Sequence, residues 1–270
     1  MYKFLIALNF VILLSCTEMP VQIPDAEIPT SNRVVLIEDL TGVRCPNCPK
    51  GAAAIENILA KYKGKVVAVG IHGDFLTSPL PESKYDFRTP KSIALENFHS
   101  PFLGKPSALI NRTLFDGETY VASDLVEQWE SYIIKELEKE QEIEFTVKKS
   151  YNSDKRLFDF TIAATSLINE TGRFNISVFV TESKIDDPQE TQGAILEEYE
   201  HNHVFRDMLT NISGDEFATQ LKKGETYTKS YKYEVPQNFN DKNMEIVVMV
   251  NRAFDGLTNV LQAHSIKIID

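Results

Sequence analysis

The chain has 270 residues, 43% of them hydrophobic, so it is long enough to bury one large core or two ordinary ones. Its formal net charge is -11, and the acidic residues are spread along the chain and not gathered in one tail. This charge is typical of a soluble surface and argues against nucleic acid as a partner, because no basic patch is present to bind phosphates.

The N-terminus has the pattern of a signal peptide. Lys3 precedes an apolar run over residues 4–14 that is too short for a permanent membrane span. The sequence Leu13-Leu14-Ser15-Cys16 then resembles a bacterial lipobox, whose cysteine receives the lipid and becomes the mature N-terminus. We therefore expect a signal peptide over residues 1–15 and lipidation of Cys16. The alternative is a signal peptide that is cut nearby, with Cys16 incidental.

Residues 16–32 are expected to form a lipidated tether, because they carry prolines among polar residues and show neither helical nor strand periodicity. Acyl chains on one cysteine anchor a protein firmly, since each buried methylene contributes about 0.8 kcal/mol. Thr17 follows the cysteine, which by resemblance to known bacterial lipoproteins favours the outer membrane over the inner. The sequence thus predicts contact with the membrane through the N-terminal lipid.

Residues 33–140 have the pattern of an α/β domain. Two short β-branched apolar runs, residues 34–39 and 66–71, predict buried strands. Between them, Pro49 opens a stretch with apolar residues at helical spacing that ends at Gly64. A strand, a helix and a second, parallel strand make up a βαβ unit.

The remainder of this domain is expected to begin with an insertion. Thr89 is the predicted cap of a helix within it. Three further elements are then expected: a strand over residues 107–111, a returning edge over 120–122, and a helix capped by Ser123 whose apolar face begins at Leu125.

Beyond residue 140 the apolar pattern changes from helical to alternating. The change places a domain boundary there, and the alternation predicts strands. Alternating apolar segments occur at residues 158–162, 174–180, 227–235, 246–250 and 264–268. We therefore expect residues 141–270 to form an all-β antiparallel sandwich of the immunoglobulin-like kind.

Two cysteines remain once Cys16 is assigned to lipid, and they form the motif Cys45-Pro46-Asn47-Cys48 at the predicted strand-to-helix junction. The amide groups and dipole of a helix N-terminus favour the thiolate of Cys45. Cys48, one turn inside, is then placed to resolve a mixed disulfide and is expected to be the more shielded sulfur. Arg44 should further stabilise the thiolate if its guanidinium lies near.

These residues resemble the active site of the thioredoxin family. Asp39 lies six residues before Cys45, where the family has a buried acid that assists proton transfer to the resolving cysteine. The segment Gly104-Lys105-Pro106-Ser107 is similar to the family's cis-proline segment, which binds extended substrate backbone. The resemblance implies a thioredoxin-like fold and possible thiol–disulfide oxidoreductase activity, with Cys45, Cys48, Asp39 and Pro106 as catalytic residues.

Two departures leave the chemistry open. Arg44 stands where thioredoxin has a tryptophan, and Pro46-Asn47 replaces its Gly-Pro, a pair that tunes the redox potential. One alternative is a permanent disulfide in an oxidising envelope. Another is a metal pair with His72 or His99 as the third ligand, by analogy with thioredoxin-like copper chaperones. The preferred interpretation involves no metal and no cofactor.

The histidine pair His201-Asn202-His203 is the main candidate feature of the second half. Two histidines at this spacing on a strand lie on the same side, which would suit a pair of metal ligands. No further ligand has convincing spacing, so a packing or interdomain contact with Arg206 is favoured. His201, His203 and Arg206, with Arg44 and His72 of the first half, are therefore candidates for binding.

Over the whole chain, the sequence resembles a family of Bacteroidota envelope lipoproteins named for the outer-membrane protein of 28 kDa. The resemblance rests on the lipobox, on Glu38-Asp39-Leu40-Thr41-Gly42, and on Tyr199-Glu200-His201-Asn202-His203-Val204-Phe205-Arg206. It implies location more than activity, with surface adhesion or receptor roles suggested. Two functions are thus expected: thiol–disulfide exchange on exported envelope or surface proteins, or non-catalytic binding or adhesion that uses the thioredoxin fold as a scaffold.

Overall fold

The structure is a computed structural model that describes residues 31–256 and 258–269. The predicted signal peptide, the lipidation of Cys16 and most of the tether lie outside the described residues. Within the described residues, no helix combines the length and the apolar character that a membrane span requires.

The first half begins with the expected βαβ unit. Strand β1 (Val35–Thr41) leads into helix α1 (Cys48–Lys61), which returns to strand β2 (Val66–His72). The strands are parallel, with Val35 opposite Val66. Pro49 lies in the first turn of α1, where the missing amide hydrogen costs nothing. The prediction of this unit is confirmed.

Helix α2 (Pro90–Phe98) follows as predicted. The Thr89 side chain accepts a hydrogen bond from the Ser92 amide at 2.9 Å, and the Ser92 hydroxyl oxygen accepts one from the Thr89 amide at 2.8 Å, so the helix begins with a capping box. Strand β3 (Ser107–Ile110) then pairs antiparallel with β1, and β4 (Ala122–Ser123) pairs with β3.

The last helix of this half starts later than expected. Helix α3 spans Trp129–Leu137 and is preceded by a 3-10 turn at Val126–Gln128. Ser123 bonds the Leu125 amide, but its carbonyl accepts the Trp129 indole N–H at 3.0 Å, which holds the chain out of the helix until that residue. Leu125 is consequently exposed, against the prediction that it begins the buried face.

The second half is built from strands, as the alternation predicted. The longer ones are β5 (Ile143–Asn152), β6 (Leu157–Ser166), β7 (Glu170–Glu182), β12 (Val204–Met208), β13 (Asp215–Leu221), β14 (Thr226–Glu234), β15 (Met244–Arg252) and β16 (Val260–Lys267). Four short strands lie between β7 and β12, namely β8 (Ile185–Asp186), β9 (Gln189–Thr191), β10 (Ala194–Leu196) and β11 (Glu200–His201), and a 3-10 turn (Asp241–Asn243) precedes β15.

One sheet runs through both halves of the described chain, in the order β16-β15-β7-β12-β2-β1-β3-β4, with β13 beside β7. The junction is β12, which pairs parallel with β2 through Val204 and Gly70. Here the Gly70 amide donates to the His203 carbonyl at 2.7 Å. Strands of the second half therefore continue the sheet of the first, a continuity that no local sequence pattern indicates.

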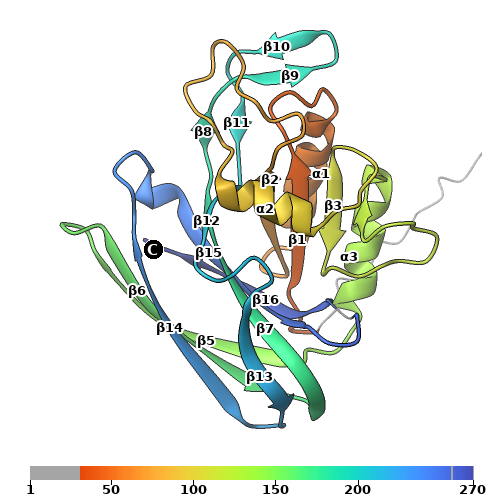
Figure 1. Cartoon of the computed structure of the whole chain (residues 1–270), viewed down its shortest axis with the longest axis vertical. Coiled ribbons are helices and arrows are strands. Elements are labelled where there is room, and N and C mark those ends of the chain that lie inside the picture. Colours follow the sequence, from red (N-terminus) through yellow and green to blue (C-terminus); the bar gives the residue numbers. More distant parts are fainter. Residues whose placement is uncertain (1–30, 257, 270) are drawn as a thin grey trace, which may run out of the picture.

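Three clusters of buried apolar side chains hold the fold together, and Figure 1 shows the helices and sheets that enclose them. Helices α1 and α3 cover one face of β1, β2 and β3, while α2 packs on the opposite face. A second sheet of order β14-β6-β5 lies over β7, β15 and β16, with a core of aromatic and aliphatic side chains between them. Because strand residues alternate between faces, Asp39 shares the α1 face with Val35 and Ile37.

Candidate functional site

Cys45 and Cys48 form a disulfide where β1 passes into α1. Cys48 is the first residue of the helix and not a turn inside it. The exposed fractions of the two residues are 1% and 2%, so the expectation that Cys48 is the more shielded sulfur is wrong. Neither sulfur is open to a protein client in this conformation.

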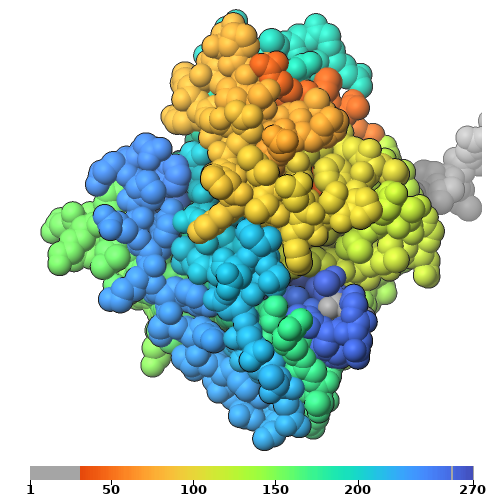
Figure 2. Space-filling view, viewed as in Figure 1, coloured from red at the N-terminus to blue at the C-terminus, as the bar shows by residue number. Residues whose placement is uncertain are grey.

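The β9–β10 hairpin, residues 189–196, covers this motif. The Glu190 amide donates to the Val43 carbonyl at 2.8 Å. The buried Gln189 side chain donates to the carbonyls of Gly42 (3.2 Å) and Cys45 (3.1 Å). In Figure 2 the teal hairpin lies directly beside the orange-red segment that follows β1. A client can therefore reach the sulfurs only when the hairpin moves.

Substitution Gln189→Ala should speed reduction of the disulfide by dithiothreitol about thirtyfold. The two hydrogen bonds to Gly42 and Cys45 contribute about 1 kcal/mol each, and 1.4 kcal/mol corresponds to a factor of ten in how often the hairpin opens. The reduction rate is measured by thiol labelling over time. Gln220→Ala, on the remote strand β13, is the matched control and should leave the rate unchanged. Equal rates for both variants would show that the hairpin does not limit access.

Asp39 is buried on the α1 face of β1. Burial raises the pKa of Asp39 to about 7, although Lys105, a hydrogen bond from Thr41 and His203 all act to lower it. One of its carboxylate oxygens, Oδ1, has no hydrogen-bond partner in the protein. A carboxyl group with a pKa near neutrality is able to accept and return a proton at physiological pH.

The loop that carries Pro106 packs against the start of α1. A Cβ atom added to Gly51 would lie 2.8 Å from the Cβ of Pro106, so the absence of a side chain there lets the ring approach the helix. The Lys105–Pro106 peptide is cis. The Lys105 ammonium donates to the carbonyls of Thr41 (2.9 Å) and Phe75 (2.8 Å) and pairs with Glu96, which fixes the loop beside Asp39.

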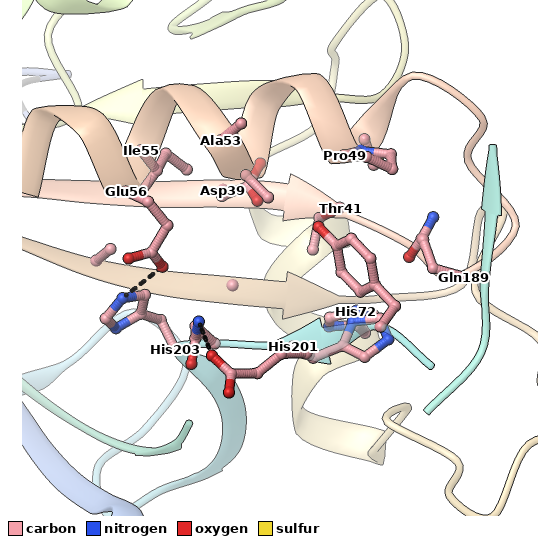
Figure 3. A pocket seen from close by; sticks show the side chains of 17 residues that line it. Asp39, Thr41, Pro49, Ala53, Ile55, Glu56, His72, Gln189, His201 and His203 are labelled. Atoms are coloured by element: carbon pink, nitrogen blue, oxygen red, sulfur yellow. Dashed lines mark hydrogen bonds and ion pairs between the residues drawn. The ribbon is translucent and has the colours of Figure 1, made fainter. Parts of the chain in front are cut away.

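A cavity of about 340 Å³ opens next to the disulfide. Its walls come from both halves of the chain: Asp39, Thr41, Cys48, Pro49, Ala52, Ala53, Ile55, Glu56, Ala68, Gly70, His72, Gln189, Tyr199, Glu200, His201, Asn202 and His203. Figure 3 shows Glu56 reaching across from α1 to His203, whose Nε2 lies 3.3 Å from the Glu56 Oε1. The structure thus brings Asp39, Cys48 and the predicted histidines to one space.

His72 and His201 lie together around the ring of Phe87, with centroids of the two imidazoles 6.0 Å apart. Desolvation holds the pKa of His72 well below its ordinary value and lowers that of His201 to about 4, so both rings are neutral at pH 7. Arg206 lies over Phe87 and bonds Glu182 at 2.8 Å. These contacts connect the second half to the first.

The histidine pair does not lie on one strand. His201 ends β11, and the chain then turns through His203, which has a φ of 55°. The expected same-side pair is therefore absent: His201 is buried with its Nε2 3.1 Å from the Asp187 carbonyl oxygen, and His203 reaches Glu56. Both nevertheless line the cavity.

The Arg44 guanidinium is engaged by backbone carbonyls of the loop after β2. Its guanidinium donates to the carbonyls of Ser78 (2.8 Å) and Pro79 (2.6 Å). Its role in the described part of the chain is to fix the loop after β2.

The metal alternative lacks a ligand set. Within residues 31–256 and 258–269, no three His, Cys, Asp or Glu side chains are grouped to hold a metal ion. His99 is engaged with Glu38 at 3.1 Å on the α2 face of the sheet, opposite the face that carries Asp39. Arg112 bonds the same Glu38 carboxylate at 2.6 and 2.7 Å and holds its pKa far below the usual range despite burial.

Two cavity residues, Glu56 and Gln189, were not predicted from the sequence, and a third, Tyr199, was noted there only as part of the family resemblance. Glu56 had a detectable signal, because Cys48, Ala52 and Glu56 are spaced four residues apart and so share one face of a helix. Gln189 had none, since it belongs to a three-residue strand whose contact lies more than 140 residues away.

Comparison with known proteins agrees with this architecture. HBP35 of Porphyromonas gingivalis has a similar structure, with a TM-score of 0.70 at 16% identity over 88% of this chain and 76% of that one. A protein of Agrobacterium tumefaciens has a TM-score of 0.54 at 14% identity over 87% of this chain and 94% of that one. These matches show similarity of fold alone.

A solved domain of the outer membrane lipoprotein Omp28 from Porphyromonas gingivalis is 21% identical over 47% of this chain and 88% of that one, and its TM-score is 0.33. No curated protein matches the chain. The model of the outer membrane protein Omp28 family matches residues 97–269, which is more than half of the chain. The chain therefore belongs to the Omp28 family of outer membrane proteins.

Proposed function

We propose that this outer membrane protein carries out thiol–disulfide exchange on exported proteins through Cys45 and Cys48. The observation that supports this most strongly is the placement of the disulfide at the start of α1, on the same cavity as a buried Asp39 whose pKa is raised to about 7. A static bridge has no use for a proton acceptor held near neutrality. An exchanging pair needs one, because a proton leaves or joins Cys48 in every cycle.

Cys45, Cys48 and Asp39 together account for every bond, electron pair and proton in the proposed reaction. In the reduced protein the Cys45 thiolate attacks a client disulfide, forming a mixed disulfide and releasing one client thiolate. Cys48 then loses its proton to Asp39 and attacks Cys45, so the client leaves with both sulfurs reduced and the Cys45–Cys48 bond forms. We propose that Pro106, which packs against Gly51 of α1, receives the client backbone.

The proposed architecture is a thioredoxin-like domain over residues 33–140 and an immunoglobulin-like sandwich over residues 141–270. The order β2-β1-β3-β4 with helices on both faces supports the first part, and the facing sheets with an apolar core support the second. We further propose that Cys16 carries the lipid that attaches the protein to the outer membrane, and that its partners are envelope or surface proteins.

Trapping of clients tests the exchange. A Cys48→Ser variant keeps the attacking sulfur but cannot resolve, so it should accumulate mixed disulfides with envelope proteins that separate on reducing gels. Cys45→Ser, which lacks the attacking sulfur, is the control and should accumulate none. Identical patterns from the two variants would rule out exchange through Cys45.

Non-catalytic binding is the second candidate, and the burial of both sulfurs beneath the hairpin favours it. In that case the disulfide only fastens the loop on which the hairpin rests. A double Cys45→Ala, Cys48→Ala variant that still binds envelope or host-surface partners with unchanged affinity would support this function over exchange.

A further inference from the structure

The cavity beside the disulfide connects Cys48 to the outside of the protein. Cys48 and Asp39 line its inner part. Glu56 and His203, whose side chains are 49% and 24% exposed, line the same space and face solvent. The space stays open because small residues line it, namely Ala52 and Ala53 on α1 and Gly70 on β2.

Two buried polar atoms at the inner part have no partner in the protein, namely Asp39 Oδ1 and His72 Nδ1. Both residues are more than nine-tenths buried and line the cavity. Buried groups of this kind are ordinarily satisfied by water when the cavity is roomy and polar. A space of about 340 Å³ accommodates several water molecules.

The outer part is an ion pair between the two halves of the chain. His203 Nε2 lies 3.3 Å from Glu56 Oε1, and this contact lowers the pKa of Glu56. The charge on His203 also acts on Asp39. Glu56 lies on the same face of α1 as Cys48, two turns further along the helix. The Glu56–His203 pair therefore lies at the outer end of the cavity, on the side that also carries the resolving cysteine.

The surroundings of Asp39 contain charged and titratable groups from every neighbouring element. These are Glu56 on α1, His72 on β2, Lys105 with its partner Glu96, and Tyr199, Glu200, His201 and His203 from the segment before β12. His72 and His201 are neutral, and Lys105 is held by two carbonyls and Glu96. The Glu56–His203 pair lines the cavity and also reaches solvent, as does the exposed Glu200, which accepts a hydrogen bond from Asn202.

We propose that this cavity is the path by which Cys48 exchanges its proton with solvent, and that Glu56 and His203 are positioning residues that pass the proton between bulk water and Asp39. The proposal rests on the exchange function proposed above. Reduction by a dithiol client ends when the second client thiolate displaces Cys45 from a mixed disulfide. In the first step, one client thiolate attacks Cys45 and forms that mixed disulfide, the Cys45–Cys48 bond breaks, and the electron pair passes to Cys48 as a thiolate. Asp39 gives its proton to that thiolate and regains one through cavity water from the Glu56–His203 pair.

Glu56→Gln and His203→Asn test the path. Asparagine is chosen at position 203 because it accepts the positive φ of 55° that this residue has. Each variant should slow reduction by dithiothreitol at pH 7 about tenfold and alter the pH profile of the rate. The control Glu127→Gln removes an exposed partner of Lys50 on α1, away from the cavity, and should retain the wild-type profile.

Two further readouts separate proton transfer from a structural role. Adding imidazole to the buffer should restore the rate of His203→Asn, because a free base can enter the cavity and carry the proton. The double variant Asp39→Asn, His203→Asn should be no slower than Asp39→Asn alone, since both residues act on one path. Fluorescence of Trp129, which lies against Gly51 on α1, verifies that each variant is folded.

The outcomes distinguish this proposal from the function on which it rests. If the wild-type disulfide is not reduced by dithiols at any pH, both fail. If the wild-type protein is reduced but the profiles of Glu56→Gln and His203→Asn superimpose on that of Glu127→Gln, with no effect of imidazole, the proton path fails and exchange stands.

Discussion

Replacing Asp39 with asparagine should stabilise the protein by about 4 kcal/mol at pH 8. Burial raises the pKa of Asp39 to about 7, whereas an aspartate in an unfolded chain has a pKa of about 3.9. The ionised carboxylate is therefore less favourable in the folded protein than in water, at about 1.36 kcal/mol for each pKa unit. Asparagine keeps the shape of the side chain and never ionises.

The pH dependence has a definite sign. Between about pH 4 and pH 7 the folded protein retains a proton on Asp39 that the unfolded chain has lost, so the contribution of Asp39 to stability declines as pH rises through this window. The gain from Asp39→Asn should be near zero at about pH 3 and level off above about pH 7. Urea unfolding of the oxidised proteins, followed by Trp129 fluorescence, measures the difference.

The neighbouring acid provides the control. Glu38 lies on the other face of β1, paired with Arg112 and His99, and this pairing lowers its pKa in spite of its burial. Its carboxylate therefore stabilises the fold above the unfolded pKa, and Glu38→Gln should destabilise the protein at pH 8. If both substitutions shifted the unfolding free energy in the same direction, the raised pKa assigned to Asp39 would be wrong.

The same Asp39→Asn variant should be a slower catalyst. Removing a positioned acid–base group costs about a hundredfold or more in rate. Asp39→Asn should therefore be more stable than the wild type, while dithiothreitol reduces its disulfide far more slowly. This combination would identify Asp39 as a residue that serves catalysis at the expense of stability. A static bridge would show the gain in stability without the loss of rate.

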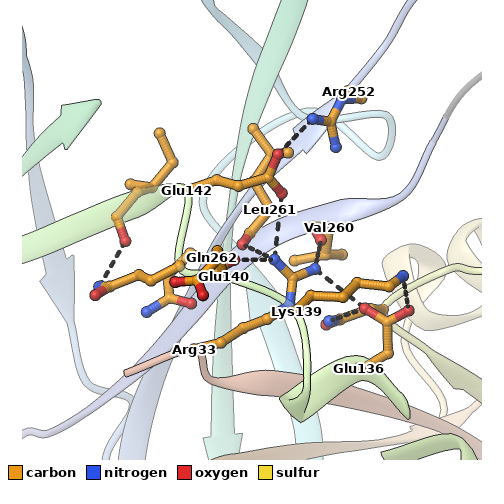
Figure 4. Close-up of polar contacts among 12 residues, drawn as sticks. Arg33, Glu136, Lys139, Glu140, Glu142, Arg252, Val260, Leu261 and Gln262 are labelled. Carbon is orange, nitrogen blue, oxygen red and sulfur yellow. Dashed lines mark hydrogen bonds and ion pairs between the residues drawn. The ribbon is translucent and has the colours of Figure 1, made fainter. Parts of the chain in front are cut away.

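Substitution Arg33→Met should lower the free energy of unfolding by about 3–5 kcal/mol. The guanidinium of Arg33 is 1% exposed and donates to the carbonyls of Leu261 (2.9 Å) and Val260 (3.0 Å) on β16. It also pairs with Glu136 on α3 at 3.0 Å and with Glu142 at 3.2 Å (Figure 4). Methionine fills the space but leaves these buried acceptors without their donor.

This cluster joins segments that lie on both sides of the predicted boundary at residue 140. Glu142 is held in addition by Arg252 on β15 at 2.6 Å. Chemical unfolding of Arg33→Met measures the loss. Lys232→Ala is the matched control. The Lys232 side chain is 75% exposed, so its ion pair with Asp159 should contribute less than about 1 kcal/mol to the free energy of unfolding. Equal effects from the two substitutions would show that the cluster does not hold the halves together.

The sequence predicted those parts of the fold that have a local signal. Residues 34–37 and 66–71 lack charged side chains and are rich in β-branched residues, and Pro49 marks the first turn of the helix between them, so β1, α1 and β2 appear where expected. The alternation in the second half likewise predicted its long strands. The family resemblance is confirmed by the match over residues 97–269.

The sequence allowed only part of the candidate site to be predicted, for a physical reason. Asp39, Cys45 and Cys48 are close in sequence, and their chemistry follows from the strand-to-helix junction. The β9–β10 hairpin over the disulfide and much of the cavity wall belong instead to the segment between β7 and β12. Its strands have only two or three residues, which is too short for a detectable apolar period. That segment is placed by β12 joining β2 at Gly70, a contact between residues 134 positions apart that no local pattern encodes.

The reduction potential of the Cys45–Cys48 pair, measured by equilibration with glutathione buffers and thiol labelling, tests most directly whether the disulfide turns over. If the pair exchanges with clients, its potential should fall in the range of exchange proteins, between about -270 and -120 mV. A potential below about -300 mV would mark the disulfide as a permanent structural bridge and exclude the exchange function.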